Sequence, residues 1–198
     1  MMRRRALARF LAPALFVLLG ACESRPGFHG TDVTGIPGYG SDFKLTDHAG
    51  TRRSMADFRG KVVVLFFGYT QCPDVCPTTL SEMRKAMGLL GDDAARLQVL
   101  FVSVDPARDT RDVLAKYVPA FHPSFLGLSG ERDAIDRVTR DFRIVAQIQE
   151  GATPESYTVN HSAMSLVFDT QGRLRLFWPY GMEAEKMVAD TRTLLKGR

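Results

Sequence analysis

The chain has 198 residues, of which 45% are hydrophobic and 24% are charged, a composition that supports one sizeable globular core. Four of its 26 basic residues, within positions 3–9, lie in an N-terminal targeting segment, and without them 22 basic residues face 22 acidic ones. A near-neutral domain without a basic stripe excludes nucleic acid from the partners that we expect. Three cysteines are also too few for a disulfide-stabilised scaffold.

The first 21 residues have the pattern of an export signal. A basic start is followed by an apolar stretch, Phe10 to Leu19, which is shorter than the ~20 residues of a membrane span but fits a signal peptide. Residues 19–22, LGAC, resemble the bacterial lipoprotein box, in which the cysteine becomes the lipidated first residue. We therefore expect a lipoprotein signal peptide over 1–21, lipidation of Cys22, and a membrane-anchored domain in the periplasm or another extracytoplasmic space. An ordinary signal peptide and an uncleaved anchor remain alternatives.

The segment that follows, residues 22–40, is expected to be a flexible tether. It contains five glycines and two prolines among scattered polar residues, and such a composition does not build a core. A flexible segment of this length has a typical reach of about 20–25 Å. The tether would therefore keep the globular domain, residues 41–198, close to the membrane and to partners embedded in it.

The domain alternates strand and helix patterns. Strands are predicted over residues 61–67, 97–104, 125–128, 142–148, 162–169 and 174–178, and helices over residues 78–90, 111–119, 131–140 and 182–195. A short hairpin around the turn at 48–50 precedes them, and a loop is expected over 151–160. This order predicts an α/β domain with a thioredoxin-like fold and an added N-terminal β-hairpin.

Two features invite a functional interpretation but have structural explanations. Met83 and Met87 could bind copper, yet they share helical spacing with leucines, which indicates core positions. The charged stretch 105–110, DPARDT, is typical of a turn in which Asp109 or Thr110 caps the next helix.

Two cysteines stand where the first long strand gives way to a helix. Residues 61–67 are almost entirely β-branched, aliphatic or aromatic, which predicts a strand buried on both faces, and Cys72 and Cys76 follow it, each before a proline. Positions i and i+4 lie one turn apart at a helix start, where amide groups and the helix dipole favour thiolates. The pair can therefore bind a soft metal, exchange disulfides, or form a structural disulfide.

A metal site needs at least one more ligand, and imidazole is the obvious candidate. His29, His48 and His122 occupy tether, turn and loop contexts. His161 opens the predicted strand 162–169 after a long loop, and a thioredoxin-like sheet would bring the start of that strand toward the cysteines. Position alone makes His161 a candidate ligand.

The chain resembles the Sco/SenC family of copper-binding proteins of cytochrome c oxidase assembly, over residues 42–195. The segments that carry the resemblance, in family order, are GKVVVLFFGYTQCPDVCPTTL at 60–80, VSVDPARDT at 102–110 and YTVNHSAMSLVFD at 157–169. The resemblance implies a thioredoxin-like fold, delivery of copper to the binuclear copper centre of cytochrome c oxidase subunit II, and binding of both Cu(I) and Cu(II) by Cys72, Cys76 and His161.

Two residues beside these ligands bear on the resemblance. Asn160 stands where the family often has aspartate, so the oxidised copper site could differ in this chain. Asp74, between the cysteines, matches the family, and we expect it to cap the helix before any effect on the metal.

Other thiol functions remain open. A thiol–disulfide oxidoreductase, reducing the cysteines of the same oxidase subunit, would use the same fold and the same pair, and a thiol peroxidase is a weaker third possibility. A disulfide between Cys72 and Cys76 would abolish metal binding, so copper loading in an oxidising compartment depends on a reductant. A thiol reductant or another periplasmic copper chaperone is therefore an expected partner.

Overall fold

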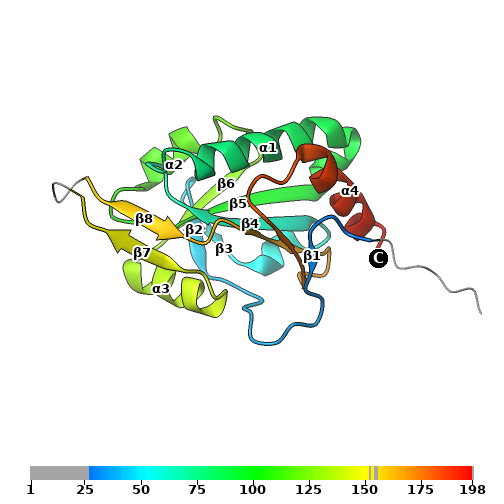
Figure 1. The fold of residues 1–198 in the computed structure, drawn as a ribbon, viewed down its shortest axis with the longest axis horizontal. Helices are drawn as coiled ribbons and strands as arrows, with labels where there is room; N and C mark the ends of the chain where they lie inside the picture. The colour runs from blue at the N-terminus through cyan, green and yellow to red at the C-terminus, as the bar shows by residue number, and fades with distance from the viewer. Residues whose placement is uncertain (1–26, 152, 154–155, 198) are drawn as a thin grey trace, which may run out of the picture.

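The computed structural model describes residues 27–151, 153 and 156–197, so the predicted signal peptide and the lipidation of Cys22 lie outside the described residues. The protein forms an eight-stranded sheet with helices on both faces, and a separate two-stranded hairpin projects from one end (Figure 1). The strand order is β1-β10-β9-β4-β5-β6-β2-β3 in the large sheet and β7-β8 in the hairpin. In the part of the chain that the structure describes, no helix has the length and apolar character needed to cross a membrane.

The strands are β1 (Thr31–Asp32), β2 (Leu45–Asp47), β3 (Arg52–Arg53), β4 (Val62–Gly68), β5 (Leu97–Ser103), β6 (Leu126–Ser129), β7 (Ala146–Gln149), β8 (Thr158–His161), β9 (Ser165–Phe168) and β10 (Leu174–Trp178). The helices are α1 (Val75–Leu90), α2 (Arg111–Tyr117), α3 (Arg132–Asp141) and α4 (Ala184–Leu195), with 3-10 turns η1 (Met55–Phe58) and η2 (Gly91–Arg96).

The centre of the sheet is the parallel pair β4 and β5, in which every residue is buried. Alternate side chains of β4 enter two different cores: Phe66 joins the cluster under α1 and α4, whereas Phe67 joins the cluster under α3 and η1. Figure 1 shows α1, α2 and α4 on one face of the sheet and α3 on the other. Burial on both faces explains the continuous hydrophobic run of β4. Met83 and Met87 lie in the first cluster, which confirms them as core residues.

The topology confirms the predicted thioredoxin-like fold. Strands β4, β5 and β6 are parallel, β9 pairs antiparallel with β4, β10 pairs antiparallel with β9, and helices cover both faces. The antiparallel hairpin β2–β3 extends the sheet beyond β6, as predicted from the turn at 48–50. Because the carboxyl ends of parallel strands share one edge, the loop after β4 lies where such folds place their sites.

Residues 27–40 differ from the tether that we expected over 22–40. The buried carboxylate of Asp190, on α4, accepts hydrogen bonds from the backbone amides of His29 and Gly30 and from Nε1 of Trp178, at 2.8, 2.9 and 2.9 Å. The next residues form β1, which pairs with β10. Three donors converging on one buried carboxylate hold this glycine-rich stretch against the domain, and composition alone does not reveal such a distant partner.

The region around His161 also differs from the prediction. The expected strand over 142–148 is shorter, because Phe142 and Ile144 enter the core from a bend after α3 and pairing begins only at β7. The expected loop over 151–160 contains β8, which pairs antiparallel with β7. His161 is therefore the last residue of β8, and three further residues separate it from the core strand β9.

Candidate metal centre

The cysteine corner joins the end of β4 to the start of α1. Helix α1 begins at Val75, earlier than the predicted residue 78, so Cys76 lies in its first turn. The Cys76 side chain is fully buried, whereas Cys72 is half-buried in the preceding loop and donates its backbone amide to the carbonyl of Tyr69. Both cysteines are free thiols. One sulfur is therefore held inside the protein and the other is accessible from its surface.

Gly68, the last residue of β4, allows the helix to start this close to the strand. A Cβ atom at this position would lie 2.6 Å from Sγ of Cys76 and 2.8 Å from the ring of Phe101, distances that packed atoms do not tolerate. A larger residue would have to displace the sulfur or the ring. The glycine thus fixes where Cys76 can sit.

The imidazole of His161 faces the buried sulfur. Its Nε2 lies 3.5 Å from Sγ of Cys76, and its Nδ1 lies 3.1 Å from the backbone carbonyl of Ser162. Because a carbonyl oxygen only accepts hydrogen bonds, Nδ1 carries the proton and the lone pair of Nε2 points toward the sulfur. The edges of Tyr69 and Phe66 flank the ring, with centroids 5.9 and 6.2 Å away. Burial lowers the pKa of His161, which favours the neutral imidazole that binds metals.

The structure brings together the three side chains that the sequence analysis singled out. The ligand atoms of Cys72, Cys76 and His161 all lie within 4.8 Å of one another, and no other such group of three is found among the described residues. Donors around one trigonal ion, at about 2.0–2.3 Å from it, are roughly 4 Å apart, so a small contraction would close the site. Two sulfurs and one imidazole suit Cu(I) and also Cu(II).

The other histidines lie elsewhere. Nδ1 of His48 accepts a hydrogen bond from the backbone amide of Gly127, and Nδ1 of His122 pairs with the hydroxyl of Ser124. His29 is exposed. None of these three joins the cysteines.

The two largest effects on the pKa of the Cys76 thiol oppose each other. Burial raises its pKa far above the ordinary value, and the backbone hydrogen bond from Tyr69 lowers it only in part. Our expectation that the helix start would favour a thiolate is therefore wrong for Cys76 in the metal-free protein, because desolvation raises the pKa of this thiol more than the backbone hydrogen bond lowers it. Metal binding at this sulfur must release a proton.

Asp74 occupies the predicted N-cap position of α1, but its side chain makes no capping bond to the backbone. Its carboxylate instead accepts from the hydroxyl groups of Thr78 and Tyr180, at 3.3 and 3.4 Å. Asp74 therefore connects the cysteine corner to the loop after β10.

Arg108 links the cysteine loop to the hairpin that carries His161. Its Nη1 donates to Oε1 of Gln71, next to Cys72, and to the backbone carbonyl of Tyr157, just before β8, at 3.1 and 2.9 Å. Its Nε donates to the buried carboxylate of Asp105, and the phenol of Tyr157 donates to the same carboxylate at 2.7 Å. The guanidinium also lies 3.5 Å from the ring centroid of Tyr157. These contacts fix the base of β8 relative to the cysteine loop.

Asp109, in the same 105–110 turn, supports the loop that carries Cys72. Asp109 is buried and accepts from the hydroxyl groups of Thr70 and Ser103, both at 2.6 Å. Burial raises the pKa of Asp109, and these hydrogen bonds oppose that rise. Thr110 caps α2, as predicted, by accepting from the amide of Val113. Turn formation thus explains only part of this motif, whose acidic and basic side chains also reach toward the site.

We expect Arg108→Lys to weaken copper binding by roughly 10- to 100-fold, the usual cost of losing a residue that orients metal ligands. Lysine keeps the charge but cannot bridge Gln71, Tyr157 and Asp105 at once. Competition titration of the reduced protein measures the affinity. Arg84→Lys, at an exposed position of α1, is the control and should bind copper as the parent does. Equal affinity of the two variants would contradict a positioning role for Arg108.

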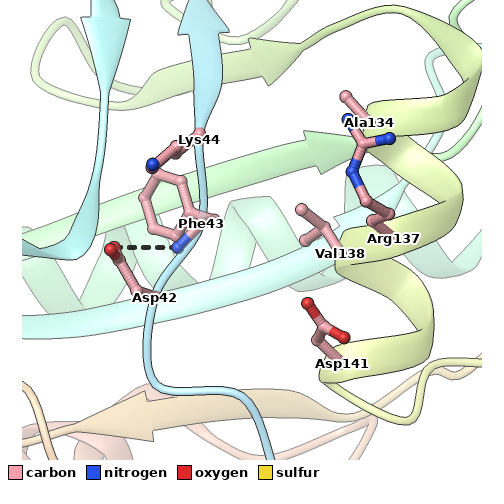
Figure 2. Close-up of a pocket in the computed structure, with 7 residues that line it drawn as sticks. All are labelled: Asp42, Phe43, Lys44, Ala134, Arg137, Val138 and Asp141. Atoms are coloured by element: carbon pink, nitrogen blue, oxygen red, sulfur yellow. Dashed lines mark hydrogen bonds between the residues drawn. The ribbon is translucent and has the colours of Figure 1, made fainter.

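A separate hollow lies beside α3 and contains none of these residues. It is a groove of about 280 Å³ between residues 42–44 and α3. Figure 2 shows Asp42 and Lys44 on one side and Arg137 and Asp141 on the other, around apolar side chains. The candidate metal centre is therefore built at a loop and helix start and not in this groove.

Known proteins share this architecture and sequence. The SCO1/SenC family model matches residues 32–196. "Protein SCO2 homolog, mitochondrial" of Bos taurus is 36% identical over 153 residues, covering 76% of this chain and 58% of the relative. The protein of the same name from Danio rerio is 38% identical over 154 residues, covering 76% and 54%. The chain thus spans less than two thirds of the length of these relatives.

Solved structures give the same result. An apo Sco1 protein from Thermus thermophilus superposes with a TM-score of 0.75 and 40% identity, covering 85% of this chain and 97% of that one. ScoI of Bradyrhizobium japonicum, solved with copper bound, superposes with a TM-score of 0.73 and 35% identity, covering 78% and 98%. Together with the family match over most of the sequence, these similarities establish that the chain belongs to the SCO1/SenC family.

Proposed function

We propose that this protein is a copper metallochaperone, and not an enzyme, which binds one copper ion through Cys72, Cys76 and His161 and delivers it to the binuclear copper centre of cytochrome c oxidase subunit II. The observation that carries the proposal is the convergence of two sulfurs and one imidazole nitrogen within 4.8 Å. The copper-bound ScoI of Bradyrhizobium japonicum supports the choice of metal.

The donor set suits an ion that must be held and then released. Two thiolates and a neutral imidazole give a site charge of −1 with Cu(I) and zero with Cu(II), so the net charge at the site stays small in either state. Cys76 lies inside the protein, whereas Cys72 and His161 are both partly accessible. An incoming ligand from a partner could therefore replace Cys72 or His161 before Cys76.

The proposed site of action is outside the cytoplasm. We place a signal peptide over residues 1–21 and a lipid anchor at Cys22, which would keep the domain beside a membrane where the oxidase subunit is assembled. In an oxidising compartment the two thiols must be kept reduced. A thiol reductant or another periplasmic copper chaperone would then act before this protein.

Transfer of copper tests the proposal. The reduced, copper-loaded protein is mixed with the soluble copper-binding domain of oxidase subunit II, and we expect copper to move to that domain as its own absorption spectrum develops. A double variant, Cys72→Ser with Cys76→Ser, should neither load nor transfer. If free copper ions fill the acceptor domain while the loaded protein does not, the chaperone proposal fails.

A second function is favoured by the unequal burial of the two thiols. A half-buried Cys72 and a buried Cys76 have the arrangement of an attacking and a resolving cysteine in a thiol–disulfide oxidoreductase. This function predicts that Cys76→Ser forms a trapped mixed disulfide with oxidised subunit II, and that His161→Ala still reduces it. Repeated failure to trap that complex would leave only the copper function.

A further inference from the structure

Tyr117, the last residue of α2, has a hydroxyl group that the fold does not use. The oxygen is buried and has no hydrogen-bond partner among the described residues. A buried hydroxyl without a partner costs about 1–3 kcal/mol, and phenylalanine would fill the same space without that cost. A hydroxyl of this kind is explained if it gains a hydrogen-bond partner in another state of the protein.

The aromatic ring of Tyr117 packs against two other aromatic rings. Its centroid lies 5.9 Å from that of Phe101 and 5.3 Å from that of Phe121. Phe101 in turn meets Sγ of Cys76 at Gly68, since both would contact a Cβ atom there. Tyr117 and Cys72 both pack against the core cluster that contains Cys76. The phenol is therefore held on the side of the cysteine corner that faces α2.

The electrostatics of the phenol agree with this position. Burial raises the pKa of Tyr117, and negative charge on Cys76 and on Cys72 raises it further. The phenol therefore stays protonated and can only gain by donating toward negative charge. Both sulfurs also raise the pKa of Tyr69, but the oxygen of Tyr69 accepts a hydrogen bond from the backbone amide of Val159, so it is not left without a partner as that of Tyr117 is.

We propose that Tyr117 is a positioning residue of the copper site, whose hydroxyl donates a hydrogen bond to the sulfur of Cys72 or Cys76 once copper has replaced the thiol proton. The inference rests on the proposed copper site. A neutral thiol accepts hydrogen bonds weakly, whereas a thiolate accepts strongly, so the bond forms only on loading. The displaced thiol protons pass to water, and the phenol keeps its own.

This hydrogen bond has consequences that a packing role would not have. It stabilises the thiolate against protonation, which favours loading with copper. It also withdraws electron density from the sulfur, which weakens covalent donation to Cu(II) more than to Cu(I). The sulfur-to-Cu(II) charge-transfer band then lies at higher energy, and the reduced state of copper is favoured. In the metal-free fold the unpaired hydroxyl does not stabilise the protein, because it is buried without a partner.

The test uses the full, reduced protein titrated with copper sulfate, and separately with Cu(I) in competition with a chelator. We expect Tyr117→Phe to move the charge-transfer band to lower energy and to weaken Cu(I) binding by about tenfold, as loss of an orienting partner does. Stability without metal should equal or exceed that of the parent. Tyr117→Leu, which also lacks the hydroxyl, should shift the band in the same direction.

Tyr39→Phe is the matched control, because its ring lies against Phe177, on the opposite core cluster. It should leave the band and the Cu(I) affinity unchanged. A band and an affinity that stay at parental values in both Tyr117 variants would overturn the inference. Failure of the proposed function is a different result, since the parent itself would then show no sulfur-to-copper band.

Discussion

His161→Ala is expected to lower the Cu(II) affinity of the reduced protein by at least about 100-fold, beyond what loss of an outer-sphere residue costs. The cause is the loss of the one nitrogen ligand, which Cu(II) prefers over sulfur alone, whereas two thiolates still hold Cu(I). The Cu(I) affinity should therefore fall much less, by about tenfold or less. Competition titrations in each oxidation state measure both values.

His29→Ala is the matched control for this prediction. His29 is exposed, and its bond to Asp190 uses only the backbone amide, which alanine retains. This variant should bind both copper states as the parent does. An unchanged Cu(II) affinity in His161→Ala would remove the imidazole from the site and would favour the thiol–disulfide oxidoreductase.

The parts of the site that were predictable from the sequence depend on local patterns. A run of apolar residues without a polar break defines β4, and helical spacing places Met83 and Met87 in the core of α1. Cys72 lies between these two elements and Cys76 in the first turn of α1, so their position at a strand-to-helix corner followed directly. Neighbours in sequence are neighbours in space at such a corner, and no long-range information is needed.

The parts that were missed depend on partners far apart in the chain. Arg108 reaches Tyr157 and Gln71 across separations of 49 and 37 residues, and Asp190 reaches His29 across 161. Each contact joins a charged residue to backbone or amide groups, which carry no sequence signal of their own. From the sequence alone, the charged turn at 105–110 therefore looks like an ordinary loop, and the glycine-rich stretch at 27–40 looks like a tether.

For His161, the sequence indicated a part in the site but not the correct place in the fold. The resemblance identified it as a ligand, but the geometry assumed for it, at the entrance of a core strand, was wrong. The residue ends β8, and the hairpin of β7 and β8 is a separate sheet whose base contacts Arg108. The imidazole is thus carried by a hairpin outside the large sheet, which Arg108 connects to the cysteine loop.

Gly68→Ala is the change expected to disturb both the fold and the site. The added methyl group would lie 2.6 Å from Sγ of Cys76 and 2.8 Å from Phe101, and both neighbours are fully buried. Overpacking of this kind costs roughly 1–3 kcal/mol of unfolding free energy. Because the sulfur is the softer neighbour, we expect it to move away from His161, with a loss of copper affinity of at least about tenfold.

Gly88→Ala separates this steric effect from the general effect of replacing glycine. Gly88 lies on α1, on the same helix as Cys76, and nothing lies within 4 Å of the position that its Cβ atom would take. Alanine there should stabilise the helix by about 1 kcal/mol and leave copper binding unchanged. Denaturant unfolding and copper titration of the two variants are compared directly. If Gly68→Ala retained parental stability and copper affinity, the cysteine corner would have more freedom than its packing indicates, and the positions of Cys76 and His161 would not be set by contact with β4.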